Sequence, residues 1–431
     1  MKCRYTKLLP LALSAAMLFT GCAAQQNARS STADSSTVTA ISQTVSGLST
    51  ATTNTASETN SAYDEAFSKR DLSGEYDEAE AIAITLGGSS ASCNSAAVTI
   101  NGSTVTITAA GTYLLYGTLD DGTIIVDATS EDKVQLVLDG VSINSTDYAA
   151  IYVKQADKVF ITLADGTVNT LSNGGTFTQI DDNNVDAVIY SKDDLTLNGT
   201  GTLKISSPAG HGVVSKDNLT ITDGVYEIAA ASHALAGKDS IAIADGTFTL
   251  ASGKDGLHSE NSDDETLGNI YIAGGTFTIN SPDDAIHANT LLTIDGGTFD
   301  ITAAEGLEAT YITINDGVIN IAASDDGVNA ARKSSAYTPT VEINGGTLNI
   351  VMGAGDTDGV DSNGNLIING GTIDVTAQSA FDYDGTAQYN GGTLIVNGSQ
   401  VDSIPNQMMG GRGGMMGGMN GGFGKGGWNH G

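Results

Sequence analysis

Short alternating runs of apolar and polar residues recur along most of the chain, and each run is bounded by Gly, Asp or Asn. This alternation predicts short β-strands with one buried face, and the bounding residues favour tight turns. One turn motif reads apolar-x-Gly-Gly-Thr-apolar, with Asp in place of the first glycine in some copies. Its copies begin at Ile221, Ile243, Ile272, Ile294, Ile314, Ile343, Ile368 and Tyr389.

A second motif, Asp-Gly-apolar or a degenerate form of it, alternates with the first. The steps between its copies are 22, 22, 29, 21, 21, 32 and 21 residues. A unit of 21–22 residues is too short for a propeller blade of about 40 residues but is typical of one coil of a parallel β-helix. We therefore expect an all-β, single-stranded parallel β-helix over residues 61–405, with inward Ile, Val, Leu and Phe as its core. The copies begin at His211, His233, Asp255, Asp284, Glu305, Asp326, Asp358 and Ser379.

The two long steps fit insertions at Asn261–Gly268 and Arg332–Thr340. Both insertions come a few residues after the second motif, so we expect two loops that rise beside the same face. Nearer the N-terminus, the sequence predicts a short helix within residues 61–80 and a first strand at Ile82–Leu86. Two less regular coils are expected to cap that end, at Val134–Ile143 and Val159–Leu163.

The charge of the chain restricts its partners. Lys and Arg number 18 against 50 Asp and Glu, which gives a formal net charge of −32. Nucleic-acid binding needs clustered Lys and Arg against the phosphates, so this composition argues against it and against docking on anionic lipid. Cations are the partners that such a surface favours.

Stacked coils place equivalent residues in columns at strand spacing, and the second motif forms such a column of acids. Neighbouring carboxylates raise each other's pKa unless a cation lies between them. Oxygen-rich sites on turns suit Ca²⁺, which takes 6–8 oxygen ligands, although any single Asp also serves as a turn former. The candidate calcium ligands are Asp255, Glu260, Asp283, Asp284, Glu305, Glu308, Asp325, Asp326, Asp358 and Asp361.

Other polar side chains are predicted beside this column. Lys154, Lys192, Lys216 and Lys238 form a second column, and each is closely followed by an acid. Pairing with those acids or a track for a polyanion are the two interpretations. The sequence has no recognisable zinc-type cluster of Cys and His, and packing or turn roles are expected for His211 and His233. The candidate substrate-binding residues are Lys238, His258, His287, Asn329, Arg332 and Lys333.

The N-terminus reads as an export signal. Basic residues precede an apolar run from Leu8 to Phe19, which is shorter than the roughly 20 residues that span a bilayer. The run ends in Phe19-Thr20-Gly21-Cys22, which resembles the bacterial lipoprotein processing box. We expect residues 1–21 to be a signal peptide, Cys22 to carry the lipid, residues 22–60 to be a Ser/Thr/Ala-rich tether and residues 406–431 to be a Gly/Met-rich tail.

Several segments together resemble one known family. They are Thr112–Leu114, Gly117–Leu119, Val134–Asn144, Ala149–Lys154 and Tyr190–Leu195, followed by the two coil motifs. The chain is similar, over about residues 65–400, to the clostridial-type carbohydrate-binding parallel β-helix family, whose cell-surface members bind cellulose and acidic plant polysaccharides. The resemblance implies a right-handed, pectate-lyase-like β-helix, bound calcium and polygalacturonate binding without established catalysis. The coils of His211, His233 and Ser379 depart from the acidic form.

The expected function is therefore that of a lipid-anchored protein on the outer face of the cell membrane. It would bind plant cell-wall polysaccharide, namely polygalacturonate and possibly cellulose, through calcium. One alternative is a calcium-dependent pectate lyase, which needs a base to take the proton at C5. The candidate bases are Lys254, Arg332 and Lys333. A surface adhesin or wall spacer without sugar specificity is the second alternative.

The lipid anchor gives a first prediction. Labelling of the expressing cells with a palmitate analogue should mark the protein, because the thiol of Cys22 would be the acylated atom. Cys22→Ala should abolish the label, whereas Cys3→Ala, within the segment that is removed, should still yield a labelled protein. Label that survives in Cys22→Ala would contradict the predicted processing site.

Overall fold

The structure, a computed structural model, describes residues 61–355 and 357–405. The predicted signal peptide, Cys22, the tether and the Gly/Met-rich tail lie outside these residues. The described part is almost entirely β-structure with one short helix, α1 (Ser61–Ala66). None of its helices is long and apolar enough to cross a membrane.

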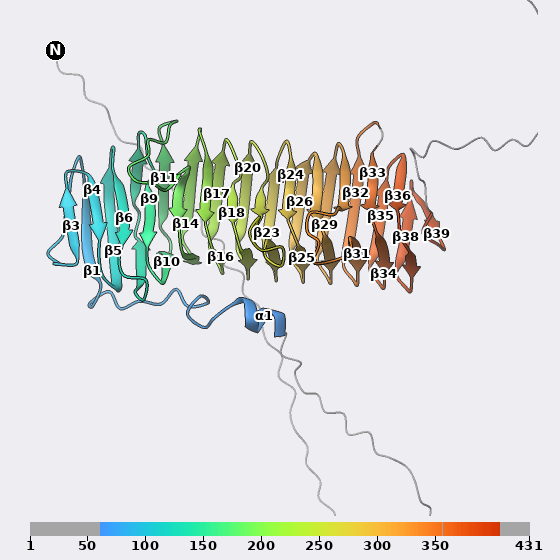
Figure 1. Cartoon of the computed structure of the whole chain (residues 1–431), viewed down its shortest axis with the longest axis horizontal. Coiled ribbons are helices and arrows are strands. Elements are labelled where there is room, and N and C mark those ends of the chain that lie inside the picture. Colours follow the sequence, from blue (N-terminus) through green and yellow to red (C-terminus); the bar gives the residue numbers. More distant parts are fainter. Residues whose placement is uncertain (1–60, 356, 406–431) are drawn as a thin grey trace, which may run out of the picture. The chain divides into compact units, whose positions relative to one another are not determined.

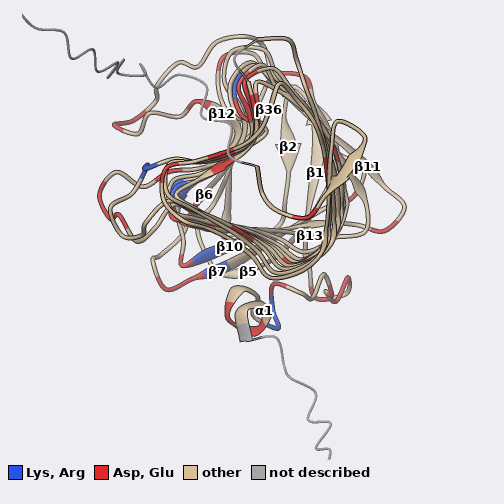
Figure 2. Ribbon diagram, turned by 90° about the vertical axis from the view of Figure 1, so that its right-hand side faces the viewer, with Lys and Arg blue, Asp and Glu red and all other residues tan. Residues whose placement is uncertain are grey.

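Thirteen strands form one long sheet in which neighbouring coils pair in parallel (Figure 1). Figure 2 places this sheet on one side of a ring of backbone. Its members are β3 (Val98–Asn101), β4 (Thr104–Ile107), β6 (Thr123–Asp127), β9 (Ile151–Gln155), β12 (Ala187–Ser191), β15 (His211–Ser215), β18 (Leu235–Gly237), β21 (Leu257–Ser259), β24 (Asp284–Ala288), β27 (Glu305–Ala309), β30 (Asp326–Ala330), β33 (Asp358–Ser362) and β36 (Ser379–Tyr383).

The remaining strands form the other two faces of the ring. One face contains β1 (Ile82–Gly88), β5 (Gly111–Leu119), β7 (Lys133–Leu138), β10 (Lys158–Leu163), β13 (Asp194–Gly199), β16 (Asn218–Ile221), β19 (Ser240–Ile243), β22 (Asn269–Ile272), β25 (Leu291–Ile294), β28 (Tyr311–Ile314), β31 (Thr340–Ile343), β34 (Asn365–Ile368) and β37 (Ala387–Tyr389). The other contains β8 (Ser142–Ser145), β11 (Val168–Asn173), β14 (Thr202–Ser207), β17 (Val225–Ala230), β20 (Thr247–Ser252), β23 (Thr276–Asn280), β26 (Thr298–Ala303), β29 (Val318–Ala323), β32 (Thr347–Met352), β35 (Thr372–Thr376) and β38 (Thr393–Val396).

The pairing register confirms the predicted coil. Leu235 pairs with Leu257, which pairs with Ile286, which pairs with Leu307. Those steps reproduce the spacing of the second sequence motif, and both insertions leave the register intact. The chain is therefore an all-β stack of parallel three-strand coils, as expected, while the handedness of its winding stays a prediction.

The core is built from identical side chains stacked from coil to coil. The rings of Tyr226, Phe248, Phe277 and Phe299 occupy one position of successive coils and are almost fully buried. Neighbouring centroids lie 5.1, 4.6 and 4.6 Å apart with nearly parallel planes. These Phe residues end the copies of the first motif that read Gly-Gly-Thr-Phe or Asp-Gly-Thr-Phe, so the motif places a strand and a core residue together.

The turns stack in the same way. The amide of Asn344 donates to Asn315, that of Asn369 to Asn344 and that of Asn390 to Asn369, over 2.7–2.8 Å. Each amide both donates and accepts, so an asparagine column satisfies itself along the stack. The second glycine of the motif has positive φ, for example 112° at Gly275, which explains why glycine recurs there.

Antiparallel hairpins close the two ends of the stack. At the N-terminal end β1 pairs with β2 (Ala91–Ser92), and β3 pairs with β4. At the other end β38 pairs with β39 (Ser399–Val401). The sequence-based expectation that Val134–Ile143 and Val159–Leu163 cap the N-terminal end is therefore wrong, since β7, β8 and β10 belong to regular coils. Hairpins at the ends cover strand edges that would otherwise recruit other chains.

Residues 61–81, here called the strap, run along the outside of the face that contains β10 and β13 (Figure 1). This segment includes the predicted short helix, observed as α1. Asp71 is its buried anchor, with 2% of its surface exposed. Its carboxylate accepts from Lys158 at 2.7 Å, from the Thr196 hydroxyl at 2.5 Å and from the Ser68 hydroxyl at 2.6 Å.

The strap gives a second prediction. Burial acts to raise the pKa of Asp71, but hydrogen bonds from Lys158 and two hydroxyl groups outweigh burial and lower it below 3.8. The pair therefore stabilises the docked strap above the ordinary carboxyl range, and this contribution is lost as the pH falls through the lowered pKa. Asp71→Asn should remove about 3 kcal/mol of docking energy at neutral pH, because it leaves Lys158 without its partner.

The measurement is hydrogen exchange and limited proteolysis of residues 61–81. Exchange there should rise strongly in Asp71→Asn, while the coils stay protected. Glu78→Gln, in an exposed part of the same segment, is the matched control. Equal protection in Asp71→Asn and in the control would show that the buried carboxylate does not hold the strap.

Candidate functional site

The two predicted columns of polar residues are present on the thirteen-stranded sheet. Asp284 pairs with Glu305 and Asp326 with Asp358, so the motif positions stack in register. A second column lies three residues further along each strand, and its register is equally continuous. Its members are His258, His287, Glu308, Asn329, Asp361 and Asp382.

Close packing between coils explains why glycine recurs in the Asp-Gly motif. A Cβ at Gly306 would lie 2.3 Å from the Gly327 carbonyl oxygen and 2.7 Å from a methyl carbon of Ile321. At Gly327 the corresponding distances, to Gly359 and Ile350, are 2.4 and 2.6 Å. Most coils therefore need glycine here to close, and the acid before it is placed at the bend that enters the sheet.

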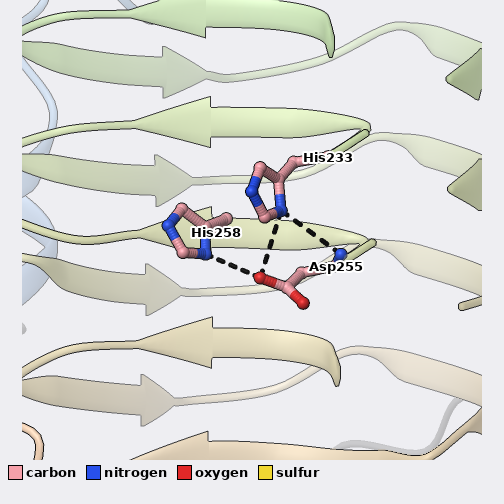
Figure 3. Close-up of side chains that lie close together, drawn as sticks. All are labelled: His233, Asp255 and His258. Carbon is pink, nitrogen blue, oxygen red and sulfur yellow. Dashed lines mark hydrogen bonds and ion pairs between the residues drawn. The ribbon is translucent and has the colours of Figure 1, made fainter. Parts of the chain in front are cut away.

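The two columns together are called the ladder from here on. At its N-terminal end, the carboxylate of Asp255 is held between imidazole rings (Figure 3). Oδ2 of Asp255 lies 2.6 Å from Nδ1 of His258 and 3.1 Å from Nδ1 of His233. Burial acts to raise the pKa of Asp255, but the two histidine contacts outweigh burial and lower it. The rings of His211, His233, His258 and His287 stack with centroids 5.0, 4.0 and 5.0 Å apart.

The middle of the ladder is a network of paired charges. Nδ1 of His287 lies 2.8 Å from Asp284 and 2.7 Å from Glu308, and Lys333 reaches Glu308 at 2.6 Å. Burial acts to lower the pKa of His287, but these two carboxylates outweigh it and raise the pKa to about 10. Burial likewise acts to raise the pKa of Glu308, and its hydrogen bonds from His287 and Lys333 outweigh burial and lower it.

Beyond this network, three acids of the columns have no ion pair within the described part of the chain. Within residues 61–355 and 357–405, neither Glu305, Asp326 nor Asp361 forms an ion pair with Lys, Arg or His. Burial is the main cause that raises their pKa values, to about 8, 7 and 6, and neighbouring carboxylates add to it. Oδ1 of Asn329 and Oδ1 of Asp382, in the same columns, are buried and find no hydrogen-bond partner among the residues that the structure describes.

We call this part of the ladder the acidic end: Glu305, Asp326, Asn329, Asp358, Asp361 and Asp382. It presents carboxylate and amide oxygens, the donors that Ca²⁺ prefers. The amide of Asn329 orients Glu305 through a 3.0 Å hydrogen bond. Asp284, Glu305 and Glu308 also bring oxygen atoms within 4.8 Å of one another. These residues fit a hard divalent cation.

The other predicted ligands lie around these columns. Asp283 and Asp325 are exposed at the turns before their coils' ladder residues. Glu260 lies 3.5 Å from Nε2 of His258 at the histidine end. The structure thus brings the column acids together and leaves these three at the margin.

The two insertions meet and form one wall beside the ladder. The hydroxyl of Ser334 donates to the backbone oxygen of Glu265 at 2.6 Å, and Ser335 bonds the Glu265 carboxylate. The first loop also supplies a backbone acceptor to Thr290, at 3.0 Å. Lys333 turns from this wall into the ladder, while Arg332 is exposed.

The lysine column is in register, but its partners differ from those expected. Lys154 pairs with Asp127 at 2.8 Å, and Lys238 pairs with Asp263 at 2.6 Å. Asp193, the acid that follows Lys192, accepts instead from the backbone of Ala156. Acids from the preceding coil or from the first insertion therefore replace the acids next in sequence.

Sequence reasoning missed the histidine cluster. His233 and His258 lie in different columns of adjacent coils, and a column-by-column comparison never places them together. The available signal was a histidine one coil before Asp255-Gly-Leu-His258. Nothing in the local sequence indicated that Lys333 would reach Glu308.

The wall gives a third prediction. Ser334→Ala should raise hydrogen exchange in residues 261–268 and 332–340 together, because it removes the buried hydrogen bond between the two loops, worth about 1 kcal/mol. The melting temperature should hardly change, since no coil loses a core contact. Ser324→Ala, at an exposed turn, is the control. Increased exchange in only one of the two loops would contradict their mutual support.

The repeating part of the chain is similar to known sequences. A family model described as carbohydrate-binding domain-containing protein matches residues 101–354 and 305–403. A carbohydrate-binding domain-containing protein from Acetivibrio thermocellus is 42% identical over 128 residues, 29% of this chain and 45% of that relative. The chain therefore spans less than half the length of this curated relative.

A solved structure is also similar. It is named as a polysaccharide lyase-like protein from C. thermocellum, in a gadolinium derivative. It shares 34% identity with a TM-score of 0.51, and the match covers 56% of this chain and 96% of that one. Since the family model covers more than half of the chain, this protein belongs to the family of carbohydrate-binding domain-containing proteins.

Proposed function

We propose that this protein binds acidic polysaccharide, with polygalacturonate as the first candidate, through calcium ions held at the acidic end. One observation carries the proposal: a continuous run of half-buried and buried oxygen donors, of which Glu305, Asp326 and Asp361 form no ion pair with Lys, Arg or His of the described residues and have raised pKa values. The proposal concerns binding, and no covalent chemistry is needed for it.

Charge explains why a cation would be required for such a partner. The chain has a formal net charge of −32, so a carboxylated polymer is repelled from it. Ca²⁺ accepts six to eight oxygen ligands, more than one coil supplies, so oxygen atoms of a glycan can complete its shell. The divalent ion would then lower the repulsion within the ladder and join the protein to the polymer.

The comparisons support a carbohydrate as the partner. The family model is described as a carbohydrate-binding domain, and the related solved structure is named polysaccharide lyase-like. The calcium in this proposal is supported by the oxygen donors of the ladder alone.

The wall beside the ladder suggests how a polymer would be aligned. Arg332 is exposed on it and offers positive charge to carboxylate groups. Lys238 lies beside the first insertion, where a carboxylate of the polymer would compete with Asp263 for it. Tyr337 in the second insertion is 42% exposed and could stack on a sugar ring. Such stacking needs no charge and is the route by which cellulose would bind.

We further propose that the binding domain is displayed outside the cell on a lipid anchor at Cys22. The sequence motif at residues 19–22 is the support for this step. A tether of polar residues would place the coils at a distance from the membrane. Contact with the membrane would then be made by the lipid alone.

A calcium-dependent lyase is the second candidate, favoured by the name of the solved relative. The reaction needs a neutral base, and Lys333 is unsuited to that role. Burial acts to lower its pKa, but the contact with Glu308 outweighs burial and raises it. Among the candidate bases from the sequence, the amine of Lys254, which is exposed, remains. Ultraviolet absorbance of the unsaturated product, measured on polygalacturonate with calcium, decides between binding and cleavage.

The acidic end gives a fourth prediction. The double variant Glu305→Gln with Asp326→Asn should weaken both calcium and polygalacturonate binding by about tenfold or more, a loss of about 1.4 kcal/mol. Calcium should raise the melting temperature of the wild type by several degrees over a chelated sample, because it binds only the folded ladder. The variant should show a smaller increase. Titration calorimetry on both ligands and thermal melts provide the measurements.

The matched control is Asp300→Asn with Asp374→Asn, which removes the same charge from β26 and β35 on another face. It should bind both ligands as the wild type does. Cellulose binding should be equal in all three proteins. If polygalacturonate binds the double variant undiminished, the glycan lies elsewhere; if it binds no form of the protein, a wall spacer becomes the better description.

A further inference from the structure

We infer that His233, Asp255 and His258 form a binding site for one divalent transition-metal ion of the class that prefers imidazole ligands, such as Zn²⁺. This site is separate from the acidic end and does not depend on calcium binding there. The inference rests on the convergence of three ligand atoms, on the arrangement of hydrogen bonds around them and on a cavity that opens beside them.

The three ligand atoms converge on one point. Nδ1 of His233 and Nδ1 of His258 approach the same oxygen of Asp255, at 3.1 and 2.6 Å (Figure 3). All three atoms lie within 4.8 Å of one another. Tetrahedral zinc with ligand bonds of 2.0–2.2 Å separates its ligand atoms by roughly 3.3 Å, close to the distances found here. The two rings, stacked at 17°, would have to turn about their side-chain bonds to direct both nitrogens at the ion.

The backbone favours a free lone pair at the site. The backbone N–H of Asp255 donates to Nδ1 of His233 at 3.2 Å, and this favours the ring form without a hydrogen on that nitrogen. Oδ2 of Asp255 lies 3.1 Å from the same Nδ1. A metal ion between these two atoms would bind a lone pair of each.

A third ring lies beside the two ligand rings. His211, His233 and His258 stack with centroids 5.0 and 4.0 Å apart. The ligand atoms that converge belong to His233, Asp255 and His258, so His211 shares the stack without sharing the site.

The site resembles open metal centres in its arrangement. Glu260 lies 3.5 Å from Nε2 of His258, where a carboxylate can orient a ring whose other nitrogen binds metal. A cavity of about 180 Å³ is lined by His233, His258, Glu260 and the side chains of Lys216 and Lys238. Three protein ligands leave a coordination position open, and the cavity gives water or a ligand oxygen access to it.

This ligand set differs in kind from the acidic end. Two imidazole nitrogens and one carboxylate suit zinc and other transition metals, whereas oxygen-only sets suit calcium and magnesium. The change occurs within two coils, because His287 in the next coil is already paired with the carboxylates of Asp284 and Glu308. One ladder would thus hold two kinds of cation at its two ends.

The test is titration calorimetry of the full chain, freed of metal by chelation, with Zn²⁺ in the presence of excess Ca²⁺. One zinc ion per chain should bind. His258→Gln and Asp255→Asn should each weaken it at least tenfold, while Glu305→Gln with Asp326→Asn should leave it unchanged. His211→Gln is the matched control, because its ring belongs to the stack but not to the converging atoms.

Nitrogen chemical shifts of labelled histidine give a second measurement that does not depend on affinity. The Nδ1 resonances of His233 and His258 should move on addition of Zn²⁺, and those of His211 should not. Melting temperatures of the variants separate loss of the site from loss of the fold. Absence of zinc binding in the wild type, or binding that survives in both folded ligand variants, would overturn the inference.

Discussion

The parallel register between coils is the constraint on which the rest of this structure depends. It places each residue about 4.8 Å from its equivalents in the coils on either side, so like side chains become neighbours whether or not they attract. Stacked phenylalanines and asparagine amides gain from this arrangement. Stacked carboxylates do not, because each charge raises the free energy of the next. The repulsion between the stacked acids of the ladder must therefore be offset by other charged groups or by bound cations.

The compensation takes a different form along the ladder. In the coils of Asp255 and Asp284, imidazole rings lie between the acids, and a lysine from the second insertion adds to them. In the coils of Glu305 and Asp326, the neighbouring side chains are acids and amides. The same backbone position thus carries nitrogen donors at one end and oxygen donors at the other. Selectivity for cations would change along one face without any change in the fold.

The sequence was sufficient to predict the coil length, both columns and both insertions. Each coil of a solenoid corresponds to one repeat in the sequence, so the repeat length gives the coil directly. The sequence was insufficient for contacts between residues that do not occupy equivalent positions of the repeat. His233 reaches His258 from another column, and Lys333 reaches Glu308 from an insertion whose path the repeat does not determine. Asp71 bonds Thr196 across 125 residues, and no repeat relates the two. The end hairpins were missed for the same reason, since the repeat stops there.

The strap has a consequence for how such a stack comes apart. In a solenoid each coil contacts only its neighbours, so coils can in principle unfold one after another from either end. The strap adds contacts to coils that are not neighbours of each other. Arg70 lies 5.0 Å from the centre of the Phe160 ring, and Asn198 donates to the backbone of Asp71. The ring of Phe67 lies 6.0 Å from that of Tyr271. A segment of about twenty residues thus touches coils that are separated by about 110 residues along the chain. Coils in that region can unfold only after the strap is released. The strap therefore joins otherwise independent coils into one cooperative unit.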